Sequence, residues 1–170
     1  MVKLFVDIDG TIASWDTELS SLDELYKKGY FLNRPVMENM LEAVRLLARD
    51  EELETYIISS VFEDSHHIIT EKQGWLDRYI PEIPKENRFF SIYGKSKRES
   101  VPFPLNQKCF LLDDYTLNLM DWEKEGQGIK VLNGINHTRK SWQGPFVDHS
   151  MEPQQISKEI KKIIANKTLA

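Results

Sequence analysis

Short apolar runs alternate along this chain with segments whose apolar residues recur at three- and four-residue spacings. The runs predict buried strands, and the spaced segments predict amphipathic helices. Such alternation favours an α/β fold in which crossover helices join the strands of a parallel sheet. The expected strands are Lys3–Ile8, Thr55–Ser59, Arg88–Ile92, Lys108–Leu112 and Ile129–Leu132.

The expected helices begin at Pro35, span Asp64–Tyr79 and Asp114–Gly126, and begin again at Pro153. Between the first strand and the first helix, residues 14–33 are interpreted as a small helical insert. Residues 135–152 show no clear periodicity, so we expect a long surface loop there, packed by Trp142 and Phe146.

Composition narrows the classes of protein that this chain could represent. Its 170 residues fit one domain with a proper core. A net charge of −5 argues against binding to a nucleic-acid polymer or an anionic membrane. Cys109 is the one cysteine, which excludes an internal disulfide, and its apolar surroundings predict a buried, inert thiol. No apolar run approaches the ~20 residues of a membrane span, and no signal peptide is visible, so the cytoplasm is the expected location.

The first strand leads into Asp7-Ile8-Asp9-Gly10-Thr11, the most informative part of the sequence. Residues i and i+2 of a strand point to the same side, so Asp7 and Asp9 should lie close together. They would do so at the carboxyl edge of the sheet, where ligands bind in open α/β folds. Like charges there repel unless a positive group lies beside them. Mg²⁺ suits two carboxylates and a substrate phosphate.

Two further strands end in polar residues. The fourth leads into Asp113-Asp114, and the second ends in Ser59-Ser60. A single acid or serine at a strand end is usually a helix cap. Four acids after two apolar strands instead favour a bound cation or substrate, and the hydroxyls at the same edge suit a phosphate oxygen.

These motifs, with a basic residue between the second and fourth strands, occur in the order seen in haloacid dehalogenase-like (HAD) phosphohydrolases. The resemblance covers roughly residues 1–13 and 34–133. It implies a single domain over 1–170 with a Rossmann-like core of about five parallel strands, helices on both faces and a small helical cap insert at 14–33. It also implies that Asp7 is the nucleophile, which forms an aspartyl-phosphate, and that Asp9 is the general acid and base.

The same resemblance implies Mg²⁺ as cofactor. Asp7, the backbone carbonyl of Asp9, and Asp114 would bind the ion, and Asp113 would support them.

For the phosphate, the resemblance implies hydrogen bonds from Ser59 and Ser60. Thr11 belongs to the same phosphate-binding motif and would orient Asp9 or cap the turn.

A basic residue should pair with the phosphoryl group and Asp7. The segment Glu-Lys-Gln-Gly-Trp at 71–75 resembles the Glu-Lys-x-x-Trp segment of cytosolic and mitochondrial 5′(3′)-deoxyribonucleotidases. We therefore favour Lys72. Lys95, after the third strand, is the alternative, and it could instead contact the substrate.

This second resemblance implies a deoxyribonucleoside monophosphate as substrate. The insert is shorter than the cap of those enzymes, so Trp15, Tyr30 and Phe31 either wall a base pocket or form the insert's own small core.

A sugar phosphate or another small metabolite remains an alternative substrate. A non-catalytic phosphate-binding or interaction protein is an alternative of another class. A signalling receiver domain is disfavoured, because its paired acids follow the first strand and its phospho-acceptor comes later. The sequence leaves a homodimer possible.

Overall fold

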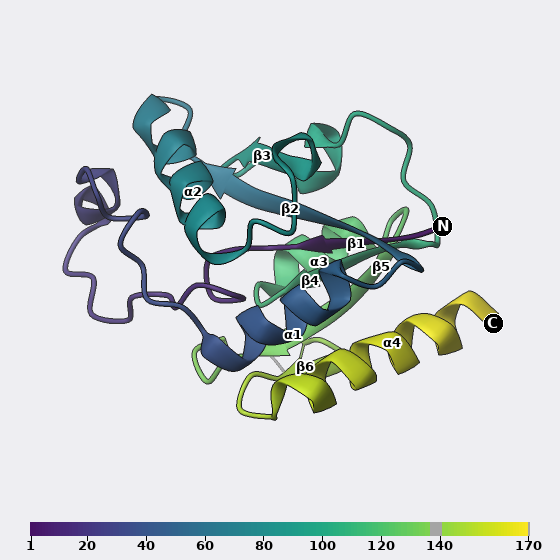
Figure 1. The fold of residues 1–170 in the computed structure, drawn as a ribbon. Helices are drawn as coiled ribbons and strands as arrows, with labels where there is room; N and C mark the ends of the chain where they lie inside the picture. The colour runs from purple at the N-terminus through teal and green to yellow at the C-terminus, as the bar shows by residue number, and fades with distance from the viewer. Residues whose placement is uncertain (137–140, 170) are drawn as a thin grey trace.

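One parallel sheet forms the centre of the molecule in a computed structural model that describes residues 1–136 and 141–169 (Figure 1). Its strand order is β3-β2-β1-β4-β5-β6, the order of doubly wound Rossmann sheets. The strands are β1 (Val2–Val6), β2 (Leu53–Val61), β3 (Arg88–Ile92), β4 (Cys109–Asp113), β5 (Gln127–Leu132) and β6 (Phe146–Asp148). The expected α/β fold is confirmed, with six strands in the described part of the chain instead of about five.

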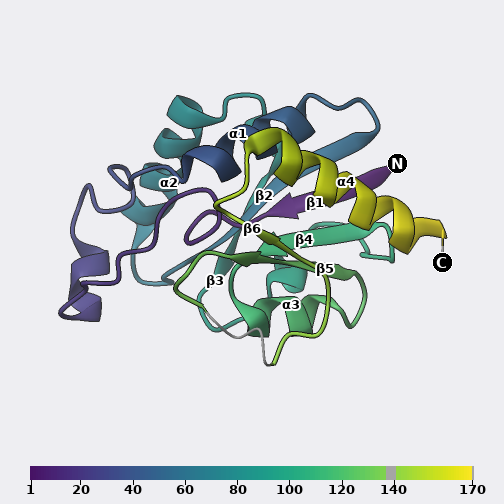
Figure 2. The ribbon, with the colours of Figure 1, turned by 90° about the horizontal axis from the view of Figure 1, so that it is seen from below.

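Helices cover both faces of this sheet (Figure 2). The α-helices are α1 (Glu38–Ala48), α2 (His66–Tyr79), α3 (Thr116–Trp122) and α4 (Pro153–Leu169). Short 3-10 helices are η1 (Leu22–Tyr26), η2 (Lys85–Asn87) and η3 (Lys97–Ser100). None of the helices in the described ranges is both long and apolar enough to cross a membrane.

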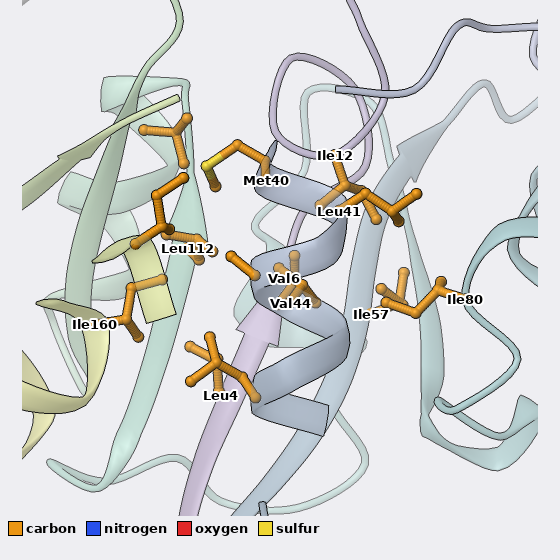
Figure 3. Close-up of a cluster of buried hydrophobic side chains, with 14 of the residues drawn as sticks. Leu4, Val6, Ile12, Met40, Leu41, Val44, Ile57, Ile80, Leu112 and Ile160 are labelled. Atoms are coloured by element: carbon orange, nitrogen blue, oxygen red, sulfur yellow. The ribbon is translucent and has the colours of Figure 1, made fainter. Parts of the chain in front are cut away.

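Alternate side chains of β1 contribute to two separate cores. Leu4 and Val6 pack on the face covered by α1 and α4, whereas Phe5 packs on the opposite face with Trp122 of α3. Figure 3 shows Val44 and its neighbours on α1 directed at the first of these faces. Burial on both faces explains why the central strands are continuous apolar runs. Cys109 is buried and unpaired, as predicted.

The sixth strand corrects the expectation of a surface loop at 135–152. Residues 146–148 pair in parallel with β5, and Trp142 is buried while Phe146 is 40% exposed. Three residues of which only Val147 is buried are too few to produce a recognisable alternation. Residues 137–140 of the expected loop lie outside the described residues.

Two helices are shorter than the sequence pattern predicts. Residues 35 and 36 are held by backbone pairing with 13 and 14, so α1 begins only at Glu38. Helix α3 begins at Thr116 instead of Asp114, because the Asp113 carboxylate accepts the backbone N–H of Tyr115 and holds this turn outside the helix.

The segment between β1 and α1 lies beyond the carboxyl end of β1 (Figure 1). It contains the single short helix η1, and its Leu25 and Phe31 pack against Val61 of β2 and Ile68 of α2. This insert, residues 14–33, therefore lies at the edge of the sheet where the strand-end acids meet.

The C-terminal helix should contribute strongly to stability through its buried face. Ile160 of α4 is fully buried in the main core, so Ile160→Ala should lower the free energy of unfolding by about 2–5 kcal/mol. Urea denaturation measures this change. Lys158→Ala, on the exposed side of the same helix, is the matched control and should change it by less than about 0.5 kcal/mol. Equal effects of the two variants would contradict the packing of α4.

Candidate active site

Carboxylates from two neighbouring strands meet at the carboxyl edge of the sheet. Asp7 and Asp9 follow β1, and Asp113 and Asp114 follow or end β4, the strand paired with β1. Between them the chain turns at Gly10, whose φ of +79° favours glycine. A Cβ atom there would lie 2.4 Å from an Asp114 carboxylate oxygen, so the close approach of the two strand ends requires glycine.

The ammonium group of Lys97 lies between these two strand ends. Its Nζ atom is 2.8 Å from Asp7 Oδ1 and 2.7 Å from Asp113 Oδ2. The lysine comes from η3, after β3, and its side chain is 3% exposed. One buried cation therefore connects acids from β1 and β4 through a segment that belongs to neither strand.

Burial determines the protonation of this cluster. It raises the pKa of Asp7 to about 7, with Lys97 acting against the rise and the nearby acids adding to it. Burial and the charge of Asp113 raise the pKa of Asp114 to about 6. Burial alone would lower the pKa of Lys97, but Asp113 and Asp7 hold it above the usual lysine value. Lys97 is therefore charged at neutral pH. Any further positive charge at this site would stabilise the ionised form of the acids.

Hydrogen bonds fix the positions of the two acids from β4. Asp114 Oδ2 accepts from the side-chain amides of Asn133 and Asn136, and Asn133 also donates to the Gly10 carbonyl at 2.9 Å. Asp113 Oδ2 accepts from Asn118 at 3.0 Å in addition to Lys97. Both carboxylates are therefore held in place by their surroundings.

Beneath them, the fully buried Lys130 donates to the Asp114 carbonyl at 2.5 Å and to the Thr116 hydroxyl at 3.0 Å. This lysine anchors the backbone that carries the acids.

The cluster fits a divalent cation with oxygen ligands. Oxygen atoms of Asp7, Asp113 and Asp114 lie within 4.8 Å of one another. In the described residues, the ammonium groups of Lys97 and Lys72 form ion pairs with these acids, and the buried Lys130 lies beneath Asp114, so four carboxylates face three ammonium groups. A divalent ion would offset the remaining negative charge. Both Asp113 oxygens already accept hydrogen bonds, which leaves Asp7 and Asp114 better suited to ligate a metal.

Asp9 belongs to a second arrangement on the other side of Asp7. Its Oδ2 atom is 2.5 Å from Lys72 Nζ and 3.4 Å from Ser59 Oγ. Lys72 also donates to Ser59 Oγ at 2.9 Å and to the Ser60 carbonyl at 2.7 Å. Lys72 is therefore fully engaged between the end of β2 and Asp9.

The structure corrects the predicted partner of Asp7. Lys72 contacts Asp9 instead, and the Lys95 side chain is 60% exposed with Glu63 4.0 Å away. Lys97 holds the position in which Lys72 or Lys95 was expected. The basic run at 95–98 contained the right segment, but the sequence does not show which of its lysines turns inward.

The three hydroxyl residues expected to bind phosphate, Ser59, Ser60 and Thr11, differ in burial and in their hydrogen-bond partners. Ser59 is fully buried beside Lys72, whereas Ser60 lines a cavity above the acids. The Ser60 hydroxyl lies 3.1 Å from that of Ser91. The Thr11 hydroxyl is buried with no hydrogen-bond partner in the described part of the chain.

A cavity of about 660 Å³ opens above the carboxylates. Asp7, Asp9, Asp114, Lys72 and Lys97 lie among the residues that line it. Ligand pockets commonly have volumes of about 300–1,000 Å³, so this one can hold a substrate of nucleotide size.

The cavity wall combines expected and unexpected aromatic residues. Trp15 and Phe31 line it, and both also pack in the insert's small cluster with Leu25, so the two predicted alternatives are not mutually exclusive. Tyr30 is not among the lining residues, and its ring packs edge-on against Phe31, with centroids 5.0 Å apart. The sequence analysis missed Tyr93 and Tyr115, two exposed rings on loops that follow strands. Because both tyrosines directly follow strands, at the edge of the sheet where ligands bind, their positions in the sequence could have indicated that they line the cavity.

Comparisons with known proteins yield distant structural similarity only. Neither the family models nor the curated proteins contain a match. The HAD domain of effector protein Lem4 from Legionella pneumophila is similar over 99% of this chain and 96% of its own, with 18% identity and a TM-score of 0.45. An inactive mutant of that domain covers 99% and 95%, with 17% identity and a TM-score of 0.47.

A third solved structure, Northeast Structural Genomics Consortium target ZR25, covers 82% of this chain and 45% of its own. Its identity is 14% and its TM-score is 0.49. Similarity at this distance supports no conclusion about function. Any such conclusion must rest on the geometry of the site.

The excess of buried carboxylates predicts a stability that depends on pH and on a divalent cation. The raised pKa values of Asp7 and Asp114 favour folding below about pH 4, and this contribution is lost as pH rises through about 6 to 7. Without metal, the melting temperature should fall between about pH 5 and pH 8. Added Mg²⁺ should raise it more at the higher pH, where the acids are ionised.

Differential scanning fluorimetry measures both effects. Asp114→Asn should remove most of the Mg²⁺ response, while Asp23→Asn, an exposed acid in the insert, should preserve it. If added Mg²⁺ left the melting temperature unchanged at both pH values, the result would contradict a cation site here.

Proposed function

We propose that this protein is a Mg²⁺-dependent phosphomonoesterase of the HAD type that hydrolyses deoxyribonucleoside 5′-monophosphates. One observation carries the proposal: a cavity with an aromatic wall opens onto four strand-end carboxylates and the buried ammonium of Lys97. Asp7 and Asp114 would hold the ion, with Asp113 as their support. When bound, Mg²⁺ would offset negative charge on the phosphoryl oxygens and orient the group for in-line attack.

In the first half of the reaction, Asp7 attacks the phosphorus atom. A bond forms between a carboxylate oxygen of Asp7 and phosphorus, and the bond from phosphorus to the sugar 5′ oxygen breaks. Asp9, in its protonated form, donates a proton to that leaving oxygen. The Lys97 ammonium, 2.8 Å from Asp7, lies where it can offset charge on the phosphoryl group.

In the second half, water regenerates the enzyme. Asp9 accepts a proton from water, the water oxygen attacks phosphorus, and the bond to Asp7 breaks to release inorganic phosphate. Asp9 is thereby protonated for the next turnover. A covalent intermediate divides one difficult displacement into two easier steps.

The cavity wall supports a nucleoside over a sugar as the leaving group. Trp15, Phe31, Phe62, Tyr93 and Tyr115 all line it. Rings of this kind stack on flat aromatic bases. The volume also suits a base and a pentose together with the phosphate.

The substrate should be identifiable from phosphate release across a panel of deoxy- and ribonucleoside monophosphates and common sugar phosphates. We expect turnover that requires Mg²⁺, is greatest on deoxynucleotides and disappears in Asp7→Asn. The nucleophile itself is then missing, so loss of covalent catalysis is expected rather than weaker binding. Unchanged activity of Asp7→Asn would exclude Asp7 as nucleophile.

The other outcomes of this panel are equally informative. Preference for a sugar phosphate would keep the chemistry and exclude the nucleotide. Activity that survives EDTA would exclude the metal. No turnover on any substrate would favour a non-catalytic phosphate-binding protein.

Two lysines separated by one residue provide a matched test of the catalytic cation. Lys97→Met should lower kcat/KM by about 10²–10³-fold, because no other ammonium contacts Asp7 in the described residues. Lys95→Met should lower kcat/KM much less, because this exposed side chain lines the cavity without contacting Asp7 and makes one ion pair near 4.0 Å. Steady-state kinetics on the best substrate, with circular dichroism as a check on folding, distinguish the two. The reverse order of effects would restore Lys95 as the phosphate-pairing residue.

A further inference from the structure

The Glu71 carboxylate binds the backbone of the insert from the neighbouring helix. Its Oε1 atom accepts the N–H of Gly29 at 2.6 Å, and its Oε2 atom accepts those of Phe31 and Leu32 at 3.1 and 3.4 Å. Glu71 is 9% exposed. Hydrogen bonds from backbone N–H groups to a buried carboxylate are charge-assisted and stronger than neutral ones.

Other contacts of the insert include the stacking of Tyr26 on Phe62, with ring centroids 4.7 Å apart, and the ion pair of Asp16 with Arg34. The regular structure of the insert is the five-residue helix η1, and Leu25 and Phe31 pack in a small cluster separate from the main cores. Near its end, the Trp75 indole donates to the Arg34 carbonyl at 2.8 Å. Glu71 therefore holds the path of residues 29–32, which no regular secondary structure fixes.

The residue after Glu71 connects this contact to the chemistry. Lys72 leaves the same turn of α2 in another direction, reaches Asp9, and lies with its Nζ atom 4.6 Å from the centre of the Phe31 ring. Phe31 also lines the cavity. The Glu71-Lys72 pair thus joins the insert on one side and the acid–base residue on the other.

We propose that Glu71 is a positioning residue that holds the insert, residues 14–33, over the cavity. In this position Phe31 and Trp15 form part of the wall against which the leaving group binds. Glu71 is not among the residues that line the cavity, so it acts through the insert and not by touching the substrate. The identity of the leaving group rests on the proposed function, whereas the anchoring of the insert does not.

Glu71→Gln tests the anchor while preserving the shape of the side chain. Its amide nitrogen carries hydrogens and cannot accept an N–H, so at least one insert donor loses its partner. The insert carries Lys27 and Lys28, both exposed, and trypsin cleaves after lysine. We expect cleavage at these positions to be about tenfold faster in Glu71→Gln than in the wild type, since local opening governs proteolysis.

Kinetics test the consequence for the substrate. In Glu71→Gln, KM for the best deoxynucleoside monophosphate should rise about tenfold, as expected from the loss of one buried hydrogen-bonded group. With para-nitrophenyl phosphate, whose activated leaving group needs little binding, kcat should stay within about twofold of the wild type. Glu86→Gln is the matched control, because Glu86 is an exposed glutamate in η2, before β3 and away from the carboxyl ends of the strands. It should leave the rate of tryptic cleavage and the kinetic constants for both substrates unchanged.

The two measurements separate this proposal from the function. Equal cleavage rates in Glu71→Gln and the wild type would overturn it. A fall in kcat for both substrates without a rise in KM would also overturn it, because Glu71 would then act on the chemistry and not on the wall. Faster cleavage in a protein that hydrolyses no nucleotide would support the anchor and contradict the proposed substrate. Matching circular dichroism spectra and melting temperatures within a few degrees would show that Glu71→Gln remains folded.

Discussion

The ammonium of Lys97, buried between Asp7 and Asp113, is the interaction on which the site depends. Removing three charged groups from water costs several kcal/mol for each ion, and only close ion pairs and additional hydrogen bonds offset that cost. Lys97 provides one cation for acids on two strands, and Asn118 and the Tyr115 backbone saturate Asp113. Loss of Lys97 would leave both carboxylates in the interior without their shared cation, so the close approach of the two strand ends depends on this side chain.

Even so, the cluster keeps an excess of negative charge. Burial, with the charge of neighbouring acids adding to it, raises the pKa values of Asp7 and Asp114, so the ionised form of the cluster is unfavourable. An arrangement that is unfavourable alone becomes favourable when a cation, or a cation with a phosphate, binds there. Local instability of this kind is typical of functional sites, where the remainder of the fold must supply the stability. Here the two cores on either face of the sheet do so.

In the proposed function, the insert would supply contacts that distinguish one phosphate ester from another. The acids and Lys97 would act on the phosphate, whereas the rest of a substrate would contact aromatic rings from the insert and from loops after β3 and β4. Glu71 and Lys72, adjacent on α2, connect the insert to Asp9. One helix therefore contacts both the insert and the strand-end acids, although these lie far apart in the sequence.

The sequence by itself determined the α/β fold, strands β1 to β5 of the central sheet and the meeting of Asp7, Asp9, Asp113 and Asp114 at one edge. These follow from local patterns, because apolar runs form buried strands and parallel strands end on the same side. Strand β6 escaped prediction because its three residues contain only one that is buried.

Tertiary structure alone decided that Lys97 faces inward while Lys95 faces solvent, and that Phe31 lines the cavity while Tyr30 does not. Lys97 begins the four-residue helix η3, and the other three residues lie in turns or bends, so none belongs to a segment long enough to show a period. The direction of each side chain there depends on contacts with distant residues, which no local pattern of polarity records.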